Sequence, residues 1–228
     1  MPEPTAPPGS RRAVVLAGGD PVGSDAMRFV GPDAFVVAAD SGVHQAAALG
    51  VHIDVVVGDL DSVERAALDA AVAAGATVEE HPVAKDATDL ELALATARRL
   101  GAHEVVVLGA GGGSRLDHFL GNVLLLTSGD FADLRLTAVV ADALLTPIHA
   151  AHGPVELVGA AGDLVTLLAA GGTAHGVRTD GLRYPLRGED LHPGSTRGVS
   201  NELLGPRASV ALERGTLLAV QPFEREVA

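Results

Sequence analysis

Short apolar runs that alternate with helical stretches are the feature of this sequence that most limits its fold. Four such runs, rich in valine and alanine, lie at Ala13–Ala17, Phe35–Ala39, Val55–Val57 and Val105–Leu108. They do not alternate between apolar and polar residues, so they are typical of strands that are buried on both faces. The pattern therefore predicts a parallel sheet that is covered by helices and connected by right-handed crossovers.

The stretches between these runs have the spacing and the ends of helices. We expect helices at Val43–Leu49, Ser62–Ala74, Thr88–Leu100 and Asp117–Leu126, and glycine follows each of the first three. Glycine is common just beyond a helix because it adopts the left-handed conformation that ends one. The third helix opens with Thr-Asp-Leu-Glu, which is a capping-box sequence.

The pattern of apolar and turn-forming residues changes after about Ala150. Leu134–Val140 and Ala143–Ile148 still resemble strands that extend the first sheet, but no long helical period follows them. Gly, Pro and Asp instead separate short apolar runs, a pattern that is typical of a small antiparallel β-sandwich. These runs are Pro154–Val158, Leu164–Ala169, Ala174–Arg178, Val199–Leu203, Ala208–Leu212 and Leu217–Val220. We therefore expect a disordered tail at 1–10, an α/β domain at 11–150 and a β-sandwich domain at 151–228.

Composition excludes several classes of function. The chain has 228 residues, of which 47% are hydrophobic but only 3% aromatic, a balance that suits an aliphatic α/β core. Its formal charge of −13 offers no basic surface to a nucleic-acid backbone. Cysteine is absent, which excludes disulfides, thiolate metal sites and cysteine nucleophiles.

Nothing in the sequence indicates export or a membrane. Residues 1–12 carry prolines and charges but no apolar core, so we expect no signal peptide. No apolar stretch approaches the roughly 20 residues that a membrane-spanning helix needs. We expect a soluble, cytoplasmic protein with no nucleic-acid or membrane partner.

Acidic residues gather where the predicted strands end. Asp40 follows the second run, and the third run leads directly into Gly58-Asp59-Leu60-Asp61-Ser62. Lys85-Asp86-Ala87-Thr88-Asp89 and Arg115-Leu116-Asp117-His118 come later, with Asn122 four residues beyond the histidine. In an open α/β sheet, ligands bind beyond the carboxyl ends of the strands. Carboxylates at that edge suit a Mg²⁺ ion that also holds substrate phosphates, which predicts an enzyme of phosphoryl chemistry.

Each acidic cluster also has a simpler structural interpretation. Asp59 and Asp61 would point the same way in an extended segment, but Asp61 and Glu64 alternatively open the following helix as capping residues. Asp89 lies at a helix start, where acidic residues are favoured by the helix dipole. Lys85 is different, because a lysine at the positive end of a helix is better explained by an anion that it binds.

A glycine loop, Gly109–Ser114, follows the fourth run. It permits close approach of backbone amides to phosphates, although it matches neither the Walker nor the dinucleotide-binding motif and a plain connector is as common. Arg115 beside it supplies a planar fork for phosphate oxygens. His118 and Asn122 share a helical face, where a structural polar pair is the alternative to ligand contact.

The order of these motifs closely resembles the thiamine pyrophosphokinase family. The resemblance covers about Ala13 to Val220 and includes the C-terminal half. The matching segments are Ala39-Asp40-Ser41-Gly42, Gly58-Asp59-Leu60-Asp61-Ser62, Lys85-Asp86-Ala87-Thr88-Asp89, Arg115-Leu116-Asp117-His118 with Asn122, Gly181-Leu182-Arg183-Tyr184-Pro185-Leu186 and Gly198-Val199-Ser200-Asn201-Glu202.

The resemblance implies both an architecture and a reaction. The family has an α/β nucleotide-binding domain followed by a β-sandwich, and it forms homodimers with two active sites at the subunit interface. Pyrophosphate moves from ATP to the hydroxyl of thiamine, and AMP leaves. The resemblance thus implies ATP as co-substrate, Mg²⁺ as cofactor and thiamine as the small-molecule partner.

The resemblance also assigns expected roles to individual residues. Magnesium is expected on Asp59, Asp61 and Asp89. The nucleotide and its phosphates are expected near Asp40, Lys85, Thr88, Arg115, Asp117 and Asn122, and thiamine near Tyr184, Ser200 and Asn201. We expect the catalytic residues to be Asp59, Asp61, Asp89, Arg115 and Asp117.

The chain departs from the family pattern in two places, and some alternatives stay open. Some members place tryptophan where Tyr184 stands, and no motif is recognised at Asp20–Asp33. Asp89 and Asp117 are both candidates for the general base. The alternative functions are a pyrophosphokinase for another hydroxymethyl heterocycle, such as a pterin, and a non-catalytic nucleotide-binding module of the same fold.

Overall fold

The structure is a computed structural model, and it describes residues 12–30, 33–112 and 115–223. The tail predicted at 1–10 and the end of the glycine loop, Gly113–Ser114, lie outside the described residues. The chain divides into two compact units, which are described separately here. The first comprises Met1–Asn122 with Ala138–Ala141, and the second comprises Val123–Thr137 with Asp142–Ala228. The functional domain boundary near residue 150 stays a prediction.

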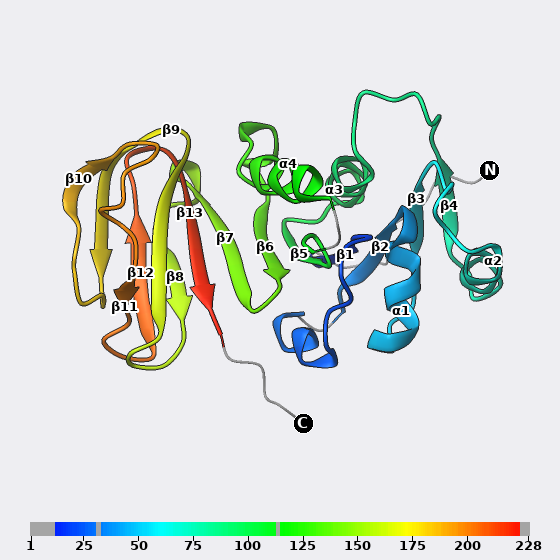
Figure 1. Ribbon diagram of the computed structural model, residues 1–228, viewed down its shortest axis with the longest axis horizontal. Coiled ribbons are helices and arrows are strands. Elements are labelled where there is room, and N and C mark those ends of the chain that lie inside the picture. Colours follow the sequence, from blue (N-terminus) through cyan, green and yellow to red (C-terminus); the bar gives the residue numbers. More distant parts are fainter. Residues whose placement is uncertain (1–11, 31–32, 113–114, 224–228) are drawn as a thin grey trace. The chain divides into compact units, whose positions relative to one another are not determined.

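The first unit contains the parallel sheet that the apolar runs predicted (Figure 1). Its strands follow the order β4-β3-β2-β1-β5, and every neighbouring pair is parallel. All residues of β2 and β3 are buried, as expected for strands covered on both faces. The strands are β1 (Arg12–Leu16), β2 (Phe35–Ala39), β3 (Val55–Gly58), β4 (Thr77–Glu80) and β5 (Glu104–Leu108).

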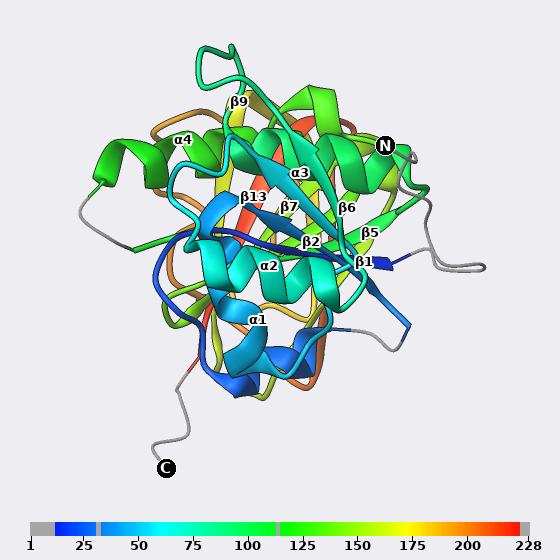
Figure 2. The same cartoon turned by 90° about the vertical axis from the view of Figure 1, so that its right-hand side faces the viewer.

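Helices cover both faces of this sheet (Figure 2). On one side α3 (Asp89–Arg99) packs against β1, β2 and β3, and on the other α1 (Val43–Leu49) packs against β1 and against α2 (Arg65–Ala73). The helix predicted to begin at Ser62 begins three residues later, at Arg65. A fourth helix, α4 (Leu116–Leu126), follows β5 in the chain.

Several helix ends follow the physical rules that predicted them. The Thr88 hydroxyl accepts a hydrogen bond from the Glu91 N–H at 3.2 Å, so Thr88 is the N-cap of α3. Gly50 ends α1 with a φ of 66°, a left-handed conformation that favours glycine. Short 3-10 helices occupy Ser24–Phe29 (η1), Asp40–Gly42 (η2), Gly129–Phe131 (η3) and Ala150–His152 (η4).

The order of the strands determines where a ligand would bind. The chain runs outward from β1 through β2 and β3 to β4, and then returns to the other side of β1 with β5. Neighbouring connections therefore leave in opposite directions at β1, and open α/β sheets bind ligands beyond the carboxyl ends of their strands at such a switch point. The residues after β1, β2, β3 and β5 lie at that edge of the sheet.

The second unit is antiparallel, as the short apolar runs predicted. One layer pairs β7 with β13 and β13 with β9, and another pairs β9 with β12 and β12 with β8. The core between these strands is aliphatic, and it includes Ile148, Val165, Leu167, Val177 and Leu217. The strands are β7 (Ala143–His149), β8 (Val155–Val158), β9 (Leu164–Asp180), β10 (Arg187–Leu191), β11 (Asn201–Glu202), β12 (Arg207–Ala211) and β13 (Arg214–Pro222).

One prediction in this unit was wrong in detail. The runs Leu164–Ala169 and Ala174–Arg178 are parts of a single strand, β9, which pairs with β13 near its start and with β12 at its end. The strand β6 (Arg135–Val140) matches the predicted run Leu134–Val140; its residues up to Thr137 belong to the second unit, and those from Ala138 belong to the first. None of the helices in the described part of the chain is long and apolar enough to cross a membrane.

Candidate active site

Three carboxylates meet at the carboxyl ends of β2 and β3. Asp40 is the first residue after β2, and Asp59 and Asp61 follow β3. One oxygen from each of the three lies within 4.8 Å of the others. Leu60, between the last two, has a φ of 62°, so this segment is a turn and not the extended segment that the sequence suggested.

The structure does not support helix capping as the role of Asp61. The N-cap of α2 is Glu64, and no side chain makes a capping hydrogen bond there. Asp61 instead accepts a hydrogen bond from the Ser62 hydroxyl at 3.0 Å, and its own N–H approaches the Asp59 carboxylate at 3.4 Å. Its carboxylate is therefore part of the acidic cluster and not of the helix.

Asp40 has the least solvent contact of the three. The residue is only 9% exposed, and its Oδ1 atom is buried with no hydrogen-bond partner among the described residues. Burial raises the pKa of Asp40, and repulsion from Asp89, Asp59 and Asp61 adds to the rise, while a hydrogen bond from the Ser41 backbone opposes it. A buried carboxylate that belongs to a cluster of carboxylates and has an oxygen without a described donor has the environment of a cation ligand.

Lys85 and Asp89 complete the cluster. The Lys85 Nζ atom lies 2.6 Å from Asp89 Oδ1 and 2.9 Å from Asp59 Oδ2. Burial alone would lower the pKa of Lys85, but hydrogen bonds to the two carboxylates outweigh it and raise the pKa. The hydrogen bond from Lys85 in turn lowers the pKa of Asp59.

Glycine at position 58 allows these side chains to come together. A Cβ atom on Gly58 would lie 2.9 Å from Asp89 Oδ1 and 3.1 Å from the Cβ atom of Asp40, and its φ of 148° also favours glycine. The three oxygens brought together most closely are nevertheless those of Asp40, Asp59 and Asp61. A role for Asp89 as a metal ligand stays a prediction.

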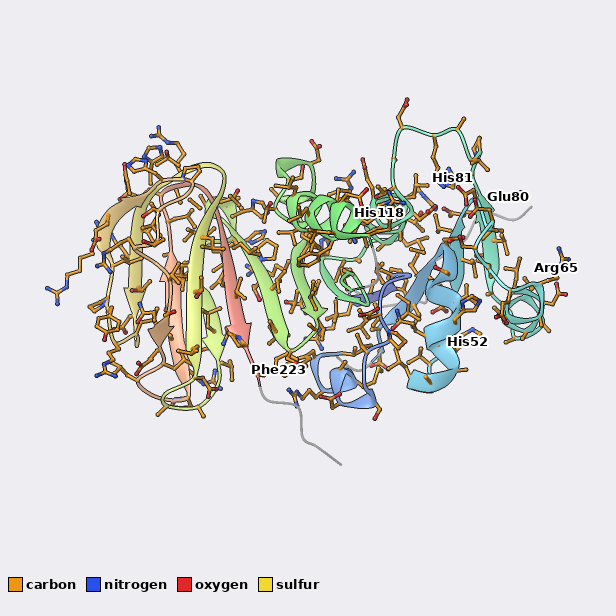
Figure 3. The ribbon with its side chains drawn as sticks, viewed as in Figure 1. His52, Arg65, Glu80, His81, His118 and Phe223 are labelled. Carbon is orange, nitrogen blue, oxygen red and sulfur yellow. The ribbon has the colours of Figure 1, made fainter. Side chains whose placement is uncertain are left out.

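The residues around the glycine loop are held in different ways. Arg115 and Asp117 form a two-bond ion pair, with Nε–Oδ1 at 2.9 Å and Nη2–Oδ2 at 2.7 Å, and both are exposed. The Arg115 guanidinium holds the pKa of Asp117 well below its usual range. Asn122 donates a hydrogen bond to the Ala110 carbonyl at 2.8 Å and so ties α4 to the loop. His118 is exposed on α4 (Figure 3).

Gln45 is a residue of this region that the sequence did not reveal. It is 6% exposed, its Nε2 donates to the Ala17 carbonyl at 2.5 Å, and its Oε1 accepts from the Val22 N–H at 3.4 Å. Gly109, with a φ of 74°, leaves room for it, because a Cβ atom there would lie 2.1 Å from Gln45 Nε2. The Gly19 N–H donates to the Gly109 carbonyl at 2.8 Å. Gln45 therefore ties α1 to the loop that follows β1, and the hydrogen bond from Gly19 to Gly109 joins that loop to the one that follows β5.

The residues expected near thiamine lie in the second unit. Asn201 is 3% exposed, and its Oδ1 accepts hydrogen bonds from the N–H groups of Tyr184 and Glu202, both at 2.9 Å. Its Nδ2 donates to the Tyr184 carbonyl at 2.8 Å. Asn201 thus clamps the backbone of Tyr184, whose side chain is 51% exposed. Ser200 is exposed, with a φ of 56°.

Two sequence-family matches cover well over half of the chain. Residues 28–138 match the family described as "Thiamin pyrophosphokinase, catalytic domain". Residues 153–217 match "Thiamin pyrophosphokinase, vitamin B1 binding domain". The first match contains the acidic cluster and Lys85, and the second contains Tyr184, Ser200 and Asn201.

Individual relatives agree with these matches. The thiamine pyrophosphokinase of Bacillus subtilis (strain 168) is 28% identical over 167 residues, which are 72% of this chain and 76% of the relative. The structure is similar to that of the Geobacillus thermodenitrificans enzyme, with a TM-score of 0.78 and 27% identity over 95% of this chain and 100% of the other. It also shares its fold with the Bacillus subtilis crystal structure, with a TM-score of 0.79 and 23% identity over 94% and 100% of the chains. The chain belongs to the thiamin pyrophosphokinase family.

Proposed function

We propose that this chain transfers a pyrophosphoryl group from ATP to the hydroxyl of thiamine, which gives thiamine pyrophosphate and AMP. Membership of the family supports the reaction. The observation that carries the site is the meeting of one carboxylate oxygen each from Asp40, Asp59 and Asp61 within 4.8 Å of one another. The burial of Asp40 supports it, because no partner for its Oδ1 atom is found among the described residues. Such a group of carboxylates suits a cation that binds phosphates. Neither of the two alternative functions, a pyrophosphokinase for a pterin and a non-catalytic nucleotide-binding module, is favoured.

The chemistry of the acidic cluster fits Mg²⁺. Its donors are carboxylate oxygens, which this ion prefers, and Asp40, Asp59 and Asp61 already bring three of them together. Asp59, Asp61 and Asp89 were the predicted ligands, and we add Asp40 to them because of its partnerless oxygen. When bound, Mg²⁺ would neutralise charge on the phosphates.

The transfer itself mainly requires that the reacting groups are positioned and that the charge on the phosphate oxygens is stabilised. The thiamine hydroxyl oxygen forms a bond to the β-phosphorus of ATP, and the bond from that phosphorus to the bridging oxygen of AMP breaks. Lys85 and Arg115 supply positive charge for the phosphate oxygens. Asp89 and Asp117 both stay candidates for the proton acceptor. The ion pair with Arg115 keeps the pKa of Asp117 low, which makes Asp117 a weak base, and Asp89 is ion-paired with Lys85.

The remaining roles concern thiamine and assembly. We propose that Tyr184 and Ser200 contact thiamine and that Asn201 holds the backbone of Tyr184 in place. We also propose Thr88 and Asn122 as contacts or supports of the nucleotide. A homodimer with active sites at the subunit interface and a cytoplasmic location complete the proposal.

An assay of AMP release tests the function directly. The protein is incubated with ATP and Mg²⁺, and with thiamine, a hydroxymethylpterin or no acceptor. Release of AMP that depends on thiamine is the expected result. Release that depends on the pterin instead would identify the rival enzyme, and no release with either acceptor would favour a non-catalytic module.

A further inference from the structure

Lys85 lies where a cation is needed, between two carboxylates of the proposed metal site. Its ammonium contacts Asp89 at 2.6 Å and Asp59 at 2.9 Å. The Lys85 side chain is only 13% exposed, and that of Asp59 only 12%. The ammonium is therefore directed into the acidic cluster and not toward solvent.

The cluster needs such a charge to stay together. Four carboxylates, those of Asp40, Asp59, Asp61 and Asp89, lie close enough that the last three all raise the pKa of the first. Carboxylates that share a site repel one another unless a positive charge lies between them. Lys85 supplies one unit of positive charge to two members of the cluster.

The position of Lys85 in the chain suits an ammonium group that can be displaced from its carboxylate partners. The segment from His81 to Thr88 connects the end of β4 to the start of α3, and His81 marks its beginning (Figure 3). Among the hydrogen bonds described for Lys85, those of its ammonium go only to Asp59 and Asp89. Lysine is a compact charge on a flexible stem with three rotatable donors, so it exchanges partners more readily than the rigid fork of arginine.

We propose that Lys85 is an internal counter-ion that takes the place of the metal ion until one binds. Without metal, its ammonium joins Asp59 to Asp89 and holds both near their binding positions. A divalent cation that binds the cluster displaces the ammonium, which then becomes available to the phosphates of ATP. The inference rests on the proposed function for the identity of the metal and the phosphates, but it concerns a step that precedes substrate binding.

Thermal unfolding of Lys85→Met, without substrates, tests the displacement. In metal-free buffer the variant should unfold at a lower temperature than the wild type, because the carboxylates lose their counter-ion. At saturating MgCl₂ this difference should vanish, since the ammonium no longer contributes in the metal-bound protein. A destabilisation of equal size at saturating Mg²⁺ would show that Lys85 stays in place, and the proposal would fail.

Calorimetric titration with MgCl₂ gives an independent measurement. Lys85→Met should bind Mg²⁺ on the order of tenfold more tightly than the wild type, because no charge-assisted hydrogen bonds have to be broken first. Unchanged or weaker binding would overturn the proposal. Arg65→Met is the matched control, since Arg65 is an exposed cation of α2 paired with Asp69, and its loss should leave the Mg²⁺ affinity unchanged.

A second variant covers the case in which Lys85→Met does not fold. Lys85→Arg keeps the charge but engages carboxylates as a fork, so it should bind Mg²⁺ more weakly than the wild type. Equal or tighter binding would contradict the displacement. The AMP-release assay on the wild type is separate from these measurements, so failure of the proposed function and failure of the counter-ion role give different results.

Discussion

At the scale of single residues, the charges of the acidic cluster make a prediction about rate. Asp59→Asn and Asp61→Asn keep the shape of the side chain but remove its charge, so each should lower kcat on the order of 100-fold or more. Steady-state kinetics with saturating Mg²⁺, ATP and thiamine measures this. Both variants at wild-type kcat would exclude the two carboxylates from the reaction.

The same two variants should differ in stability, because only one of the carboxylates pairs with Lys85. Asp61→Asn relieves repulsion without breaking an ion pair described for Asp61, so the melting temperature without ligand should stay level or rise. Asp59→Asn removes a partner of the ammonium of Lys85, whose side chain is only 13% exposed, and should lower the melting temperature. Thermal unfolding of the two variants in metal-free buffer checks this order.

Tyr184 makes a residue-scale prediction about specificity. The thiazolium ring of thiamine is cationic, and an aromatic face attracts such a ring by about 0.5–2 kcal/mol. Tyr184→Ala should therefore raise the KM for thiamine roughly 3- to 30-fold and leave the KM for ATP nearly unchanged. Because the ring is half-exposed, folding should be little affected, and Tyr184→Trp should restore the affinity. An unchanged KM for thiamine in the alanine variant would remove Tyr184 from the site.

The sequence revealed the acids and not Gln45, and the difference has a physical reason. Asp59 and Asp61 follow a strand directly, so their place at the edge of the sheet can be read from adjacent residues. The partner of Gln45 lies 28 residues away, and the contact exists only because α1 packs against β1 and the loop that follows it. Asn201 is similar: the family resemblance implied a ligand contact, but its hydrogen bonds to the Tyr184 backbone depend on two segments 17 residues apart.

At the scale of elements, the strands that contain an apolar run were predictable, and the polar strands β4 and β10 were not. β2 and β3 are covered on both faces, so their sequences are apolar throughout. β4 lies at the edge of the sheet and reads Thr-Val-Glu-Glu, and β10 reads Arg-Gly-Glu-Asp-Leu. Such strands face water along much of their length, so no apolar run marks them.

The attachment of the loop after β1 to α1 through Gln45 makes an element-scale prediction. Gln45→Met keeps the volume of the side chain but removes both hydrogen bonds to the β1 loop, which leaves the Ala17 carbonyl without this donor. The loops at the switch point should then lose their fixed position, so the KM for ATP should rise on the order of tenfold while the KM for thiamine stays the same. Steady-state kinetics with each substrate varied in turn measures both constants.

A control separates this positioning effect from general instability. Gln45→Glu is nearly isosteric and keeps an acceptor for the Val22 N–H, but it places an oxygen against the Ala17 carbonyl. It should therefore impair ATP use at least as much as Gln45→Met does. If both variants melt at lower temperature but keep the wild-type KM for ATP, Gln45 supports the fold and does not position the nucleotide site.

At the scale of the whole molecule, a buried and a partly buried histidine of the second unit, His149 and His152, link stability to pH. His149 is 4% exposed, its Nδ1 lies 3.0 Å from the Thr216 hydroxyl, and its Nε2 is buried with no partner among the described residues. The His152 ring lies edge-on to it at 5.3 Å and contacts the Ala132 carbonyl. Burial lowers the pKa of both histidines, and the charge of His152 also lowers that of His149.

The direction of the effect follows from proton binding. Between the lowered pKa values and the ordinary value of about 6.5, the unfolded chain binds more protons than the folded chain. The stability that neutral His149 and His152 contribute is therefore fully present above about pH 6.5, the ordinary histidine pKa, and is lost as the pH falls toward and through the lowered pKa values. The raised pKa of Asp40 acts in the opposite direction, so wild-type stability alone does not isolate the histidines.

Comparison with a variant that lacks one of these histidines isolates the effect. His149→Gln cannot titrate but can still reach the Thr216 hydroxyl, so its melting temperature should fall less than that of the wild type between pH 7 and pH 5, a window that spans the ordinary histidine pKa. His52→Gln, a change at an exposed position, serves as the control and should follow the wild-type curve. Because Asp40 is present in all three proteins, its contribution cancels in the comparison. Parallel curves for His149→Gln and the wild type would mean that His149 takes no part in the acid sensitivity of the fold.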